Sequence, residues 1–571
     1  METWVVMCTS SSTTDSVSRG RQQCITPRLA AALDKCKISD RNAVHLLTAA
    51  AEAFGADPTD IILNRTSIRE RRQVLREERI REFREHFTFP EGSIFEVHWD
   101  GKLLPSLEWG HEKVDRLAII ITFDGKEQLM GVLETGGSGL EMAQAVHGTL
   151  IDWGIDSKVN AMCFDTTASN TGRKKGVCPR LEKILGRELL HLACRHHVFE
   201  TVLRGVFEAM MGPNSSLDTP LFKRFKDSWS TIDRMKTDHG MIDEVVRDEV
   251  ADVRDSVLDF VSLNLRGKQY RDDYKEFLEL TALFLNAEYS AELTVRAPGA
   301  VHHARWMAKA LYCLKIFLFR SQFKLTKAEV NRVREICIFL VGVYLKAWFQ
   351  APLTIQAPYH DFLFLQTIRN YRSTNEKISH AAVKKFCNHL WYLSPDLLLF
   401  SLFDPNVPLL IEKRMRDKLL TCREEEEREG SEELDDQLED TDDSNEEVSR
   451  PEKRPRRLQL NCKDVDKVCK KNFAELISGY SLRFFKILNI DSEFLKEELD
   501  KWPENEAFQS ICSQLKTLRV VNDVAERGIK LISEYNDVLC KDESQKQYLV
   551  QTVQMYRQQY PDARKSTVVK K

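Results

Sequence analysis

The segment 159–200 constrains the fold of this chain more than any other stretch. A short apolar run, 159–164, ends at Asp165, and a polar turn that contains Gly172 follows it. A basic amphipathic segment then leads to a second apolar run, 189–193, which ends at Cys194 and is followed closely by His197. Short apolar runs bounded by turn residues are typical of buried strands. The segment therefore predicts a strand that ends in a carboxylate, a helix, and a strand that ends near a histidine.

The residues before this segment predict three further strands. The sequence FEVHWD, at 95–100, alternates apolar and polar side chains, as expected for a strand. The apolar run 116–123 and the run 128–134 are joined by Asp124-Gly125, a strong hairpin signal. A helix is expected over 139–154. The order strand–strand–strand–helix–strand–helix–strand predicts a mixed sheet with helices on its faces, which is the RNase H-like order.

The remainder of the chain is predicted to be helical, with one interruption. Long amphipathic segments fill 200–410, whereas 424–449 is too acidic and too poor in apolar residues to fold. The fold class is therefore α/β plus α, an RNase H-like mixed sheet interrupted by a large helical insertion. The expected parts are a disordered tail (1–23), a small helical N-terminal region (24–90), the first part of the core (91–205), the helical insertion (206–422), a disordered acidic linker with a basic cluster (423–460), and a helical C-terminal region completing the core (461–571).

Composition narrows the class of protein. The chain has 571 residues, 42% of them hydrophobic, so several domains with real cores are expected. No apolar run approaches the roughly 20 residues needed to span a bilayer, so no membrane partner is expected. The net charge of -4 conceals local basic patches. One patch is a candidate nuclear import signal and comprises Lys453, Arg454, Arg456 and Arg457. It predicts nuclear localisation, although such clusters also arise by chance.

Two aspartates on neighbouring predicted strands indicate a metal-assisted phosphoryl-transfer site. Cleavage of a phosphodiester by two divalent ions, about 4 Å apart, requires carboxylates held close together. Asp100 on the first strand and Asp165 at the end of the fourth are in suitable positions. Asp100 is alternatively a hairpin-turn residue, with Asp124 as a weaker candidate for the first-strand acid. Asp165 is alternatively a turn or helix-capping residue.

Four short motifs, in order along the chain, resemble those of the transposases of the hAT superfamily. They are FDTTASN at 164–170, C-x-x-H at Cys194–His197, Arg305-Trp306, and VAER at 524–527. The family has an RNase H-like core interrupted by a large helical insertion. The resemblance implies a transposase, or a protein derived from one, that acts on DNA in the nucleus and forms a homo-oligomer.

The resemblance also implies roles for individual residues. Asp100, Asp165 and Glu526 would hold two Mg²⁺ or Mn²⁺ ions and so carry strand cleavage and transfer. His197 would assist at the scissile phosphate, and Trp306 would stack on a flipped base. Arg195 and Arg305 are further expected DNA contacts.

Structural interpretations of the same residues stay open. Cys194 fits a buried thiol better than a metal ligand, because the three further ligands of a zinc site are lacking. His197 and Trp306 are alternatively core residues, and Glu526 a solvated helix acid. No BED-type zinc finger precedes the core, which leaves the role of the N-terminal helices open. The competing hypotheses are therefore a catalytically inactive, transposase-derived DNA-binding or scaffold protein, and a non-transposing nuclease of the RNase H type.

Overall fold

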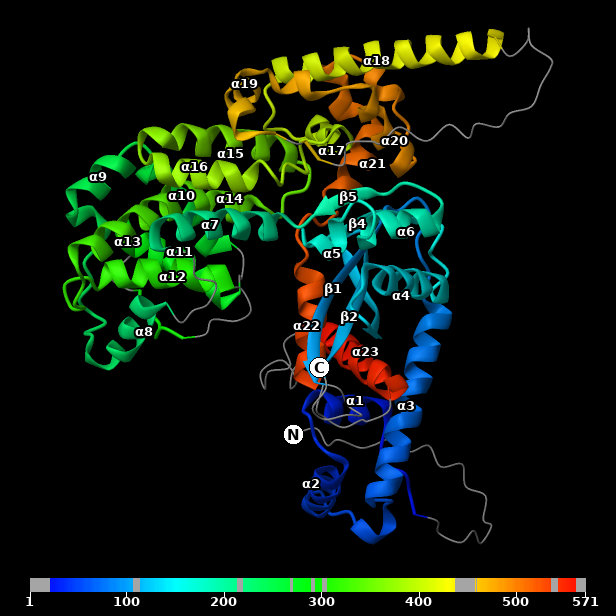
Figure 1. Ribbon diagram of the computed structural model, residues 1–571. Helices are drawn as coiled ribbons and strands as arrows, with labels where there is room; N and C mark the ends of the chain where they lie inside the picture. The colour runs from blue at the N-terminus through cyan, green and yellow to red at the C-terminus, as the bar shows by residue number, and fades with distance from the viewer. Residues whose placement is uncertain are drawn as a thin grey trace. The chain divides into compact units, whose positions relative to one another are not determined.

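The computed structural model describes residues 21–105, 113–212, 219–267, 271–288, 293–299, 305–436, 457–458, 460–535 and 543–560 (Figure 1). The chain divides into two compact units. The first comprises Met1–Phe89, Leu103–Val114 and Lys530–Lys571, and the second comprises Pro90–Lys102 and Asp115–Ile529. The C-terminal region, expected to complete the core as a whole, is thus shared between the two units.

Within its described residues, the first unit is built from four main helices. They are α1 (Pro27–Lys35), α2 (Asp40–Ala53), α3 (Arg65–His86) and α23 (Glu543–Gln559). Thr26, Ser39 and Asn64 accept hydrogen bonds from backbone N–H groups in the first turns of α1, α2 and α3. Helix α23 contacts both α1 and α3 and buries Leu549 and Val553 completely. This apolar packing explains why the end of the chain joins the N-terminal helices.

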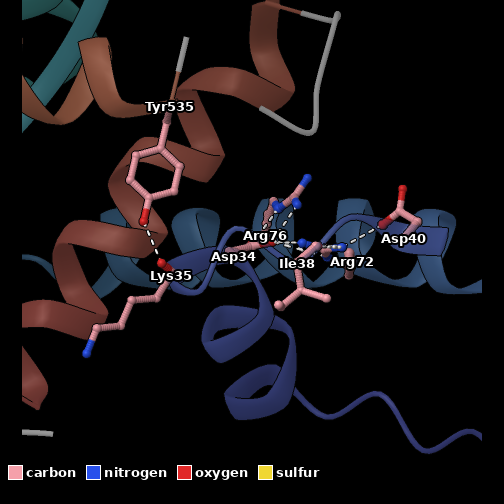
Figure 2. A network of polar contacts seen from close by, with 7 residues as sticks. All are labelled: Asp34, Lys35, Ile38, Asp40, Arg72, Arg76 and Tyr535. Atoms are coloured by element: carbon pink, nitrogen blue, oxygen red, sulfur yellow. Dashed lines mark hydrogen bonds and ion pairs between the residues drawn. The ribbon is translucent and has the colours of Figure 1, made fainter. Parts of the chain in front are cut away.

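A buried ionic network joins α1 to α3 in the first unit (Figure 2). The Asp34 carboxylate is fully buried and accepts hydrogen bonds from Arg72 and Arg76, with Nη2–Oδ1 distances of 2.5 and 2.7 Å. Arg72 also donates to Asp40 Oδ1 at 2.6 Å. Two buried guanidinium groups thus share one carboxylate, so loss of Asp34 leaves both without their main counter-ion.

A five-stranded mixed sheet forms the centre of the second unit. Its strands are β1 (Phe95–Pro105), β2 (Lys113–Phe123), β3 (Lys126–Thr135), β4 (Val159–Phe164) and β5 (Leu190–Ala193). Their order is β3-β2-β1-β4-β5, with β2–β3 antiparallel and both β1–β4 and β4–β5 parallel. The predicted mixed α/β class and strand sequence are confirmed. The expected hairpin is also present, with positive φ at Asp124 and Gly125.

Helices cover both faces of this sheet. Helices α4 (Gly139–Asp152) and α6 (Val177–Leu185) lie side by side next to the sheet (Figure 1). On the opposite face, Gly528 in α22 (Asp523–Tyr535) approaches Ala118 and Ile120 so closely that an added Cβ would lie 3.1–3.2 Å from them. Glu96 and His98, on the polar side of the alternating strand β1, are buried rather than exposed, and they contact Arg519 and Asn522 in the segment before α22.

The predicted helical block follows the last strand. It begins with α7 (Arg195–Met211), which starts directly after β5. The short helix α5 (Ala168–Thr171) is not part of this block and follows β4. The further helices are α8 (Pro220–Asp227), α9 (Glu244–Val250), α10 (Arg254–Gly267), α11 (Asp272–Phe284), α12 (Arg305–Leu318), α13 (Lys327–Phe339), α14 (Leu345–Gln350), α15 (Ala357–Asn370), α16 (Glu376–Phe386), α17 (Pro395–Leu398), α18 (Leu409–Asp436), α19 (Val465–Lys470), α20 (Arg483–Leu488) and α21 (Glu506–Leu515). Among the described residues, no helix has both the length and the apolar character needed to cross a membrane.

Helix α18 extends beyond the expected boundary at residue 422. It continues to Asp436, through residues that were expected to be disordered because of their acidity. Ion pairs one turn apart, Arg423–Glu427 and Arg428–Glu424, offset part of that repulsion. Residues 437–456 lie outside the described part of the chain, and with them Lys453, Arg454 and Arg456. The remaining member of the basic cluster, Arg457, donates a hydrogen bond to the carbonyl oxygen of Asn388 at 2.7 Å.

Candidate functional site

A polar cavity of about 100 Å³ lies in the second unit, beside the middle of β1 and the end of β4. Strand β1, the turn after β4, helices α7, α11 and α14, and the start of α22 contribute to its wall. The lining residues are Asp100, Asp165, Cys194, His196, His197, Glu200, Tyr274, Trp348, Asn522 and Glu526. The cavity therefore brings together the three acids and the histidine that the sequence singled out, from positions more than 400 residues apart in the chain.

The pairing of β1 with β4 places the two aspartates level with each other. His98 is paired with Cys163, and Asp100 and Asp165 each follow two residues later. Asp100 belongs to β1 itself and is not a hairpin-turn residue. Burial, reinforced by the negative charges of Asp165 and Glu526, raises the pKa of Asp100 to about 7. This carboxyl group thus sits among other acids without enough positive charge to balance them.

Asp165 is both a turn residue and a wall residue of the cavity. Its Oδ1 accepts hydrogen bonds from the Thr167 hydroxyl at 2.7 Å and from Asn170 Nδ2 at 2.5 Å. Asn170 in turn accepts a hydrogen bond from Trp99 Nε1 at 2.9 Å. Among the described residues these bonds engage Oδ1 and not Oδ2. The turn therefore fixes the carboxylate while one oxygen can serve a ligand in the cavity.

Glu526 lies in the first turn of α22, and its side chain is 46% exposed. Its Oε2 is 3.6 Å from Nη1 of Arg271, the residue that precedes α11. Partial burial and the negative charge of Asp523 raise the pKa of Glu526, whereas Arg271 acts to lower it. Arg271 also binds Asp273 through Nη2, at 2.6 Å. Glu526 is thus an acid of the cavity that already has a cationic neighbour.

The C-x-x-H motif lies at the junction of β5 and α7. Cys194 is a buried thiol, 3% exposed, whose sulfur accepts a hydrogen bond from the backbone N–H of Asn522 at 3.2 Å. Burial raises the pKa of the Cys194 thiol well above its usual range. The pKa of His197 is lowered by burial, against the opposing charge of Asp165. His197 therefore presents a neutral imidazole to the cavity at neutral pH.

Glu200 and His196 belong to the site but were not singled out from the sequence. Both lie on α7. Glu200 is three residues after His197 and four after His196, and residues at these spacings share one face of a helix, so the spacing was an available signal for Glu200. Burial and the charge of Glu526 raise the pKa of Glu200 to about 8. Glu200 is therefore mostly protonated at pH 7 and adds no full negative charge.

His196 connects α7 with α14 and α22. Its ring stacks on Trp348 with centroids 4.0 Å apart, and its Nδ1 lies 3.2 Å from Asp523 Oδ1. Burial opposes ionisation of Asp523, but His196, Arg527 and Arg271 outweigh it and lower the pKa of Asp523 to about 2. Asp523 therefore keeps its charge, and these contacts fix the helix turn that carries Glu526.

Two of the proposed DNA-contacting residues, Arg195 and Trp306, do not line the cavity. Arg195 is 2% exposed; its Nη2 donates to Asp361 Oδ1 at 2.6 Å and its Nη1 donates to the carbonyl oxygen of Ala351 at 2.9 Å. These bonds give Arg195 a structural role between α7 and α15. Trp306 is half-buried, with its ring centroid 6.2 Å from that of Phe207. The side chain of Arg305 lies outside the described part of the structure.

Comparisons with known proteins add no relative to this picture. No protein-family model matches the chain, and no curated protein matches it. The chemistry of the site therefore rests on its geometry: three carboxyl groups, a neutral histidine and a protonated glutamic acid around one small cavity. Oxygen ligands of this kind suit Mg²⁺ and Mn²⁺.

Proposed function

We propose that this chain is a transposase of the hAT type, or a derivative of one, which cleaves and transfers DNA strands with Mg²⁺ or Mn²⁺ held by Asp100, Asp165 and Glu526. The observation that carries the proposal is the convergence of these three side chains on one cavity. They come from β1, from the turn after β4 and from α22. Convergence of acids from such distant positions is costly without a ligand, because their charges repel each other.

The donor set fits divalent cations. All three residues offer carboxylate oxygens, the ligands that Mg²⁺ and Mn²⁺ prefer. The raised pKa of Asp100, caused by burial and then by Asp165 and Glu526, reports uncompensated negative charge that a bound cation would neutralise. Two such ions, when bound, activate an attacking oxygen and stabilise a leaving oxygen at phosphorus.

The surrounding side chains can support this chemistry. A neutral His197 can donate a hydrogen bond to a phosphate oxygen from one ring nitrogen or accept a proton at the other. Protonated Glu200 can donate a hydrogen bond into the cavity without adding to the repulsion among the acids. The Trp99–Asn170–Asp165 hydrogen bonds hold one of the proposed ligands in a fixed orientation.

The sheet supports the RNase H-like part of the proposal. Three successive strands are followed by two that alternate with helices, and β1 lies between β2 and β4. The helical block then separates β5 from α22, as a large insertion between the second and third acids would. DNA contacts through Arg305 and Trp306, homo-oligomer formation, and nuclear import through Lys453, Arg454, Arg456 and Arg457 complete the proposal.

Nicking of supercoiled DNA tests the proposed activity. The purified full chain would be incubated with plasmid and Mn²⁺, beside Asp165→Asn and Asp124→Asn variants made identically. Asp124 lies in the β2–β3 hairpin, outside the cavity, and Asn tolerates its positive φ. Nicking by the parent and by Asp124→Asn, but not by Asp165→Asn, is expected. Equal nicking by all three proteins would assign the activity to a contaminant or to another site.

One observation favours the inactive, transposase-derived binding protein as a second candidate. Glu526 is 3.6 Å from the guanidinium of Arg271, so a cationic side chain stands where a metal ligand would need to be available. For this candidate, the chain would bind DNA in a gel-shift assay yet leave plasmid intact with Mn²⁺. An Arg271→Gln variant that also fails to nick would show that the ion pair is not what prevents cleavage.

A further inference from the structure

Three side chains with metal-binding chemistry meet inside the sheet, beside the cavity of the proposed active site. Glu96 and His98 project from β1, and Cys163 projects from β4. All three are 0% exposed. One potential ligand atom from each lies within 4.8 Å of the other two, and Glu96 Oε2 is 3.4 Å from His98 Nε2. A carboxylate, an imidazole and a thiol are therefore gathered where water has no access.

Hydrogen bonds do not satisfy this cluster. Glu96 Oε2 accepts from the backbone N–H of Arg519 at 2.8 Å and from the Thr122 hydroxyl at 3.1 Å. The other oxygen, Glu96 Oε1, is buried without a hydrogen-bond partner among the described residues. A buried carboxylate oxygen with no donor is costly, so the site calls for a further positive group.

The ring of His98 is oriented as in many metal sites. Asn522 donates through Nδ2 to the carbonyl oxygen of Trp99 at 2.9 Å, so its Oδ1 faces His98 Nδ1 at 3.3 Å. Because Oδ1 only accepts, this network assigns the proton to Nδ1 and leaves a lone pair on Nε2. Thr122 Oγ1 is 3.0 Å from Nε2, but its single proton cannot serve both Nε2 and Glu96. Metal-bound histidines commonly donate their other ring nitrogen to an oxygen in this way.

From this geometry we propose that Glu96, His98 and Cys163 bind one Zn²⁺ ion as a structural site, distinct from the carboxylates of the cavity. Because the three ligand atoms lie at most 4.8 Å apart, an ion placed between them would be within about 2.8 Å of each. Typical Zn–S and Zn–N distances are about 2.3 and 2.0 Å. Small inward shifts therefore complete the coordination. Thiolate and carboxylate balance the charge of the ion, and the Thr122 hydroxyl or a water provides the fourth ligand.

The ion would connect three segments that are far apart in the sequence. Glu96 also binds Arg519, and His98 binds Asn522, in the segment that leads directly into α22. Zinc at this place would hold β1 to β4 and fix the start of the helix that carries Glu526. Since the ligands are fully buried, the ion enters as the chain folds, and the Cys163 thiol releases its proton to solvent on binding. The proposal does not depend on whether the chain cleaves DNA.

Metal content of the purified protein tests the site. The full chain would be produced in zinc-supplemented medium, dialysed against a chelator, and analysed by elemental mass spectrometry. About one zinc ion per chain is expected for the parent and for Cys337→Ser, a matched change of a fully buried thiol in α13. The Asp165→Asn variant should also keep its zinc, because the ion is not held by the cavity. Cys163→Ser and His98→Gln should lose it.

Cobalt substitution identifies the ligands without reference to stability. Protein produced with Co²⁺ should show thiolate-to-cobalt charge-transfer absorption in the near ultraviolet, and Cys163→Ser should lack it. A parent protein that holds neither zinc nor cobalt would overturn the proposal, and this result needs no variant to fold. Persistence of the thiolate band in Cys163→Ser would overturn it as well. Either result would leave a buried imidazole–carboxylate contact as the account of Glu96 and His98.

Discussion

Glu526 Oε2 lies 3.6 Å from Nη1 of Arg271, so the third acid of the cavity faces a guanidinium group contributed by the start of α11. Arg271 is 34% exposed and is anchored by Asp273. It acts to lower the pKa of both Glu526 and Glu200. In the absence of a divalent ion, this arginine therefore partly balances the negative charge of Glu526.

Replacing Arg271 should strengthen metal binding. In an Arg271→Gln variant Glu526 loses its counter-ion, and a divalent cation no longer competes with a guanidinium for this carboxylate. We expect Mn²⁺ to bind about three- to tenfold more tightly at pH 8, a gain of roughly 1 kcal/mol. Isothermal titration calorimetry would measure it, with Arg247→Gln, an exposed arginine on α9, as the control. Weaker Mn²⁺ binding in Arg271→Gln would mean that Arg271 positions the acids rather than competing for them.

The raised pKa of Asp100 predicts a stability difference with a definite pH window. Burial, then the charges of Asp165 and Glu526, moves the pKa from its ordinary 3.8 to about 7 in the folded chain. Between these values the folded state holds a proton that the unfolded state has released, so stability falls as pH rises from about 4 to about 7. Above pH 7 both states are ionised and the cost is constant.

An Asp100→Asn variant removes that cost. Without metal, it should be more stable than the parent at pH 8 by on the order of 1–2 kcal/mol, after allowance for solvent screening. The advantage should shrink towards zero as pH falls to about 4. Thermal melts in chelator at several pH values would measure this, with Asp124→Asn as the control. An equal difference at every pH would show that Asp100 acts through packing and not through its charge.

The ionic network of the first unit should be sensitive to loss of its shared carboxylate. Asp34→Ala leaves the buried guanidinium groups of Arg72 and Arg76 without their main partner and should cost about 3–5 kcal/mol. Asp40 is 17% exposed and contacts only Arg72 in this network, so an Asp40→Ala variant should lose only about 1 kcal/mol of stability. Denaturant unfolding, monitored through the rate of tryptic cleavage within α3, would compare the stability of the two variants. Similar losses in both variants would contradict the central role of Asp34.

Arg195 distinguishes a structural role from a DNA-binding one. An Arg195→Lys variant cannot keep both the bonds to Asp361 and the bond to the Ala351 carbonyl oxygen. We expect a loss of about 3 kcal/mol in stability, with DNA affinity of the folded protein unchanged at low temperature. Thermal melts and gel-shift assays on the same preparation would separate the effects. Full stability combined with weaker DNA binding would show that Arg195 reaches DNA.

Much of the second unit could be predicted from local patterns. The apolar run at 116–123, the Asp124-Gly125 hairpin and the strand ending at Asp165 each carry a short-range signal, and the strand sequence followed from them. The positions of Asp100 on one strand and of Asp165 directly after the adjacent strand could be predicted for the same reason. Glu526 was identified only through a resemblance, because nothing in an acidic helix marks one glutamate as facing a distant sheet.

Other features depend on long-range contacts that local patterns do not contain. The division of the C-terminal region arises from the packing of Leu549 and Val553 in α23 within the first unit. Helix α18 extends through an acidic segment because ion pairs support it, including Arg423 with Glu493 from a later segment. His196, Glu200 and Arg271 join the site because helices pack around the cavity. Glu96 and His98 are buried where the segment before α22, with Arg519 and Asn522, packs against the polar side of β1.

The central claim is that Asp100, Asp165 and Glu526 bind divalent cations together. The most direct measurement is a Mn²⁺ titration of the purified chain followed by electron paramagnetic resonance, in which bound Mn²⁺ loses the signal of the free ion. At pH 8 the parent should bind Mn²⁺ at least about tenfold more tightly than Asp165→Asn or Glu526→Gln, and its affinity should fall as protons return to Asp100 below about pH 7. Identical Mn²⁺ titrations for the parent and Asp165→Asn, both at pH 8 and below pH 7, would contradict the claim.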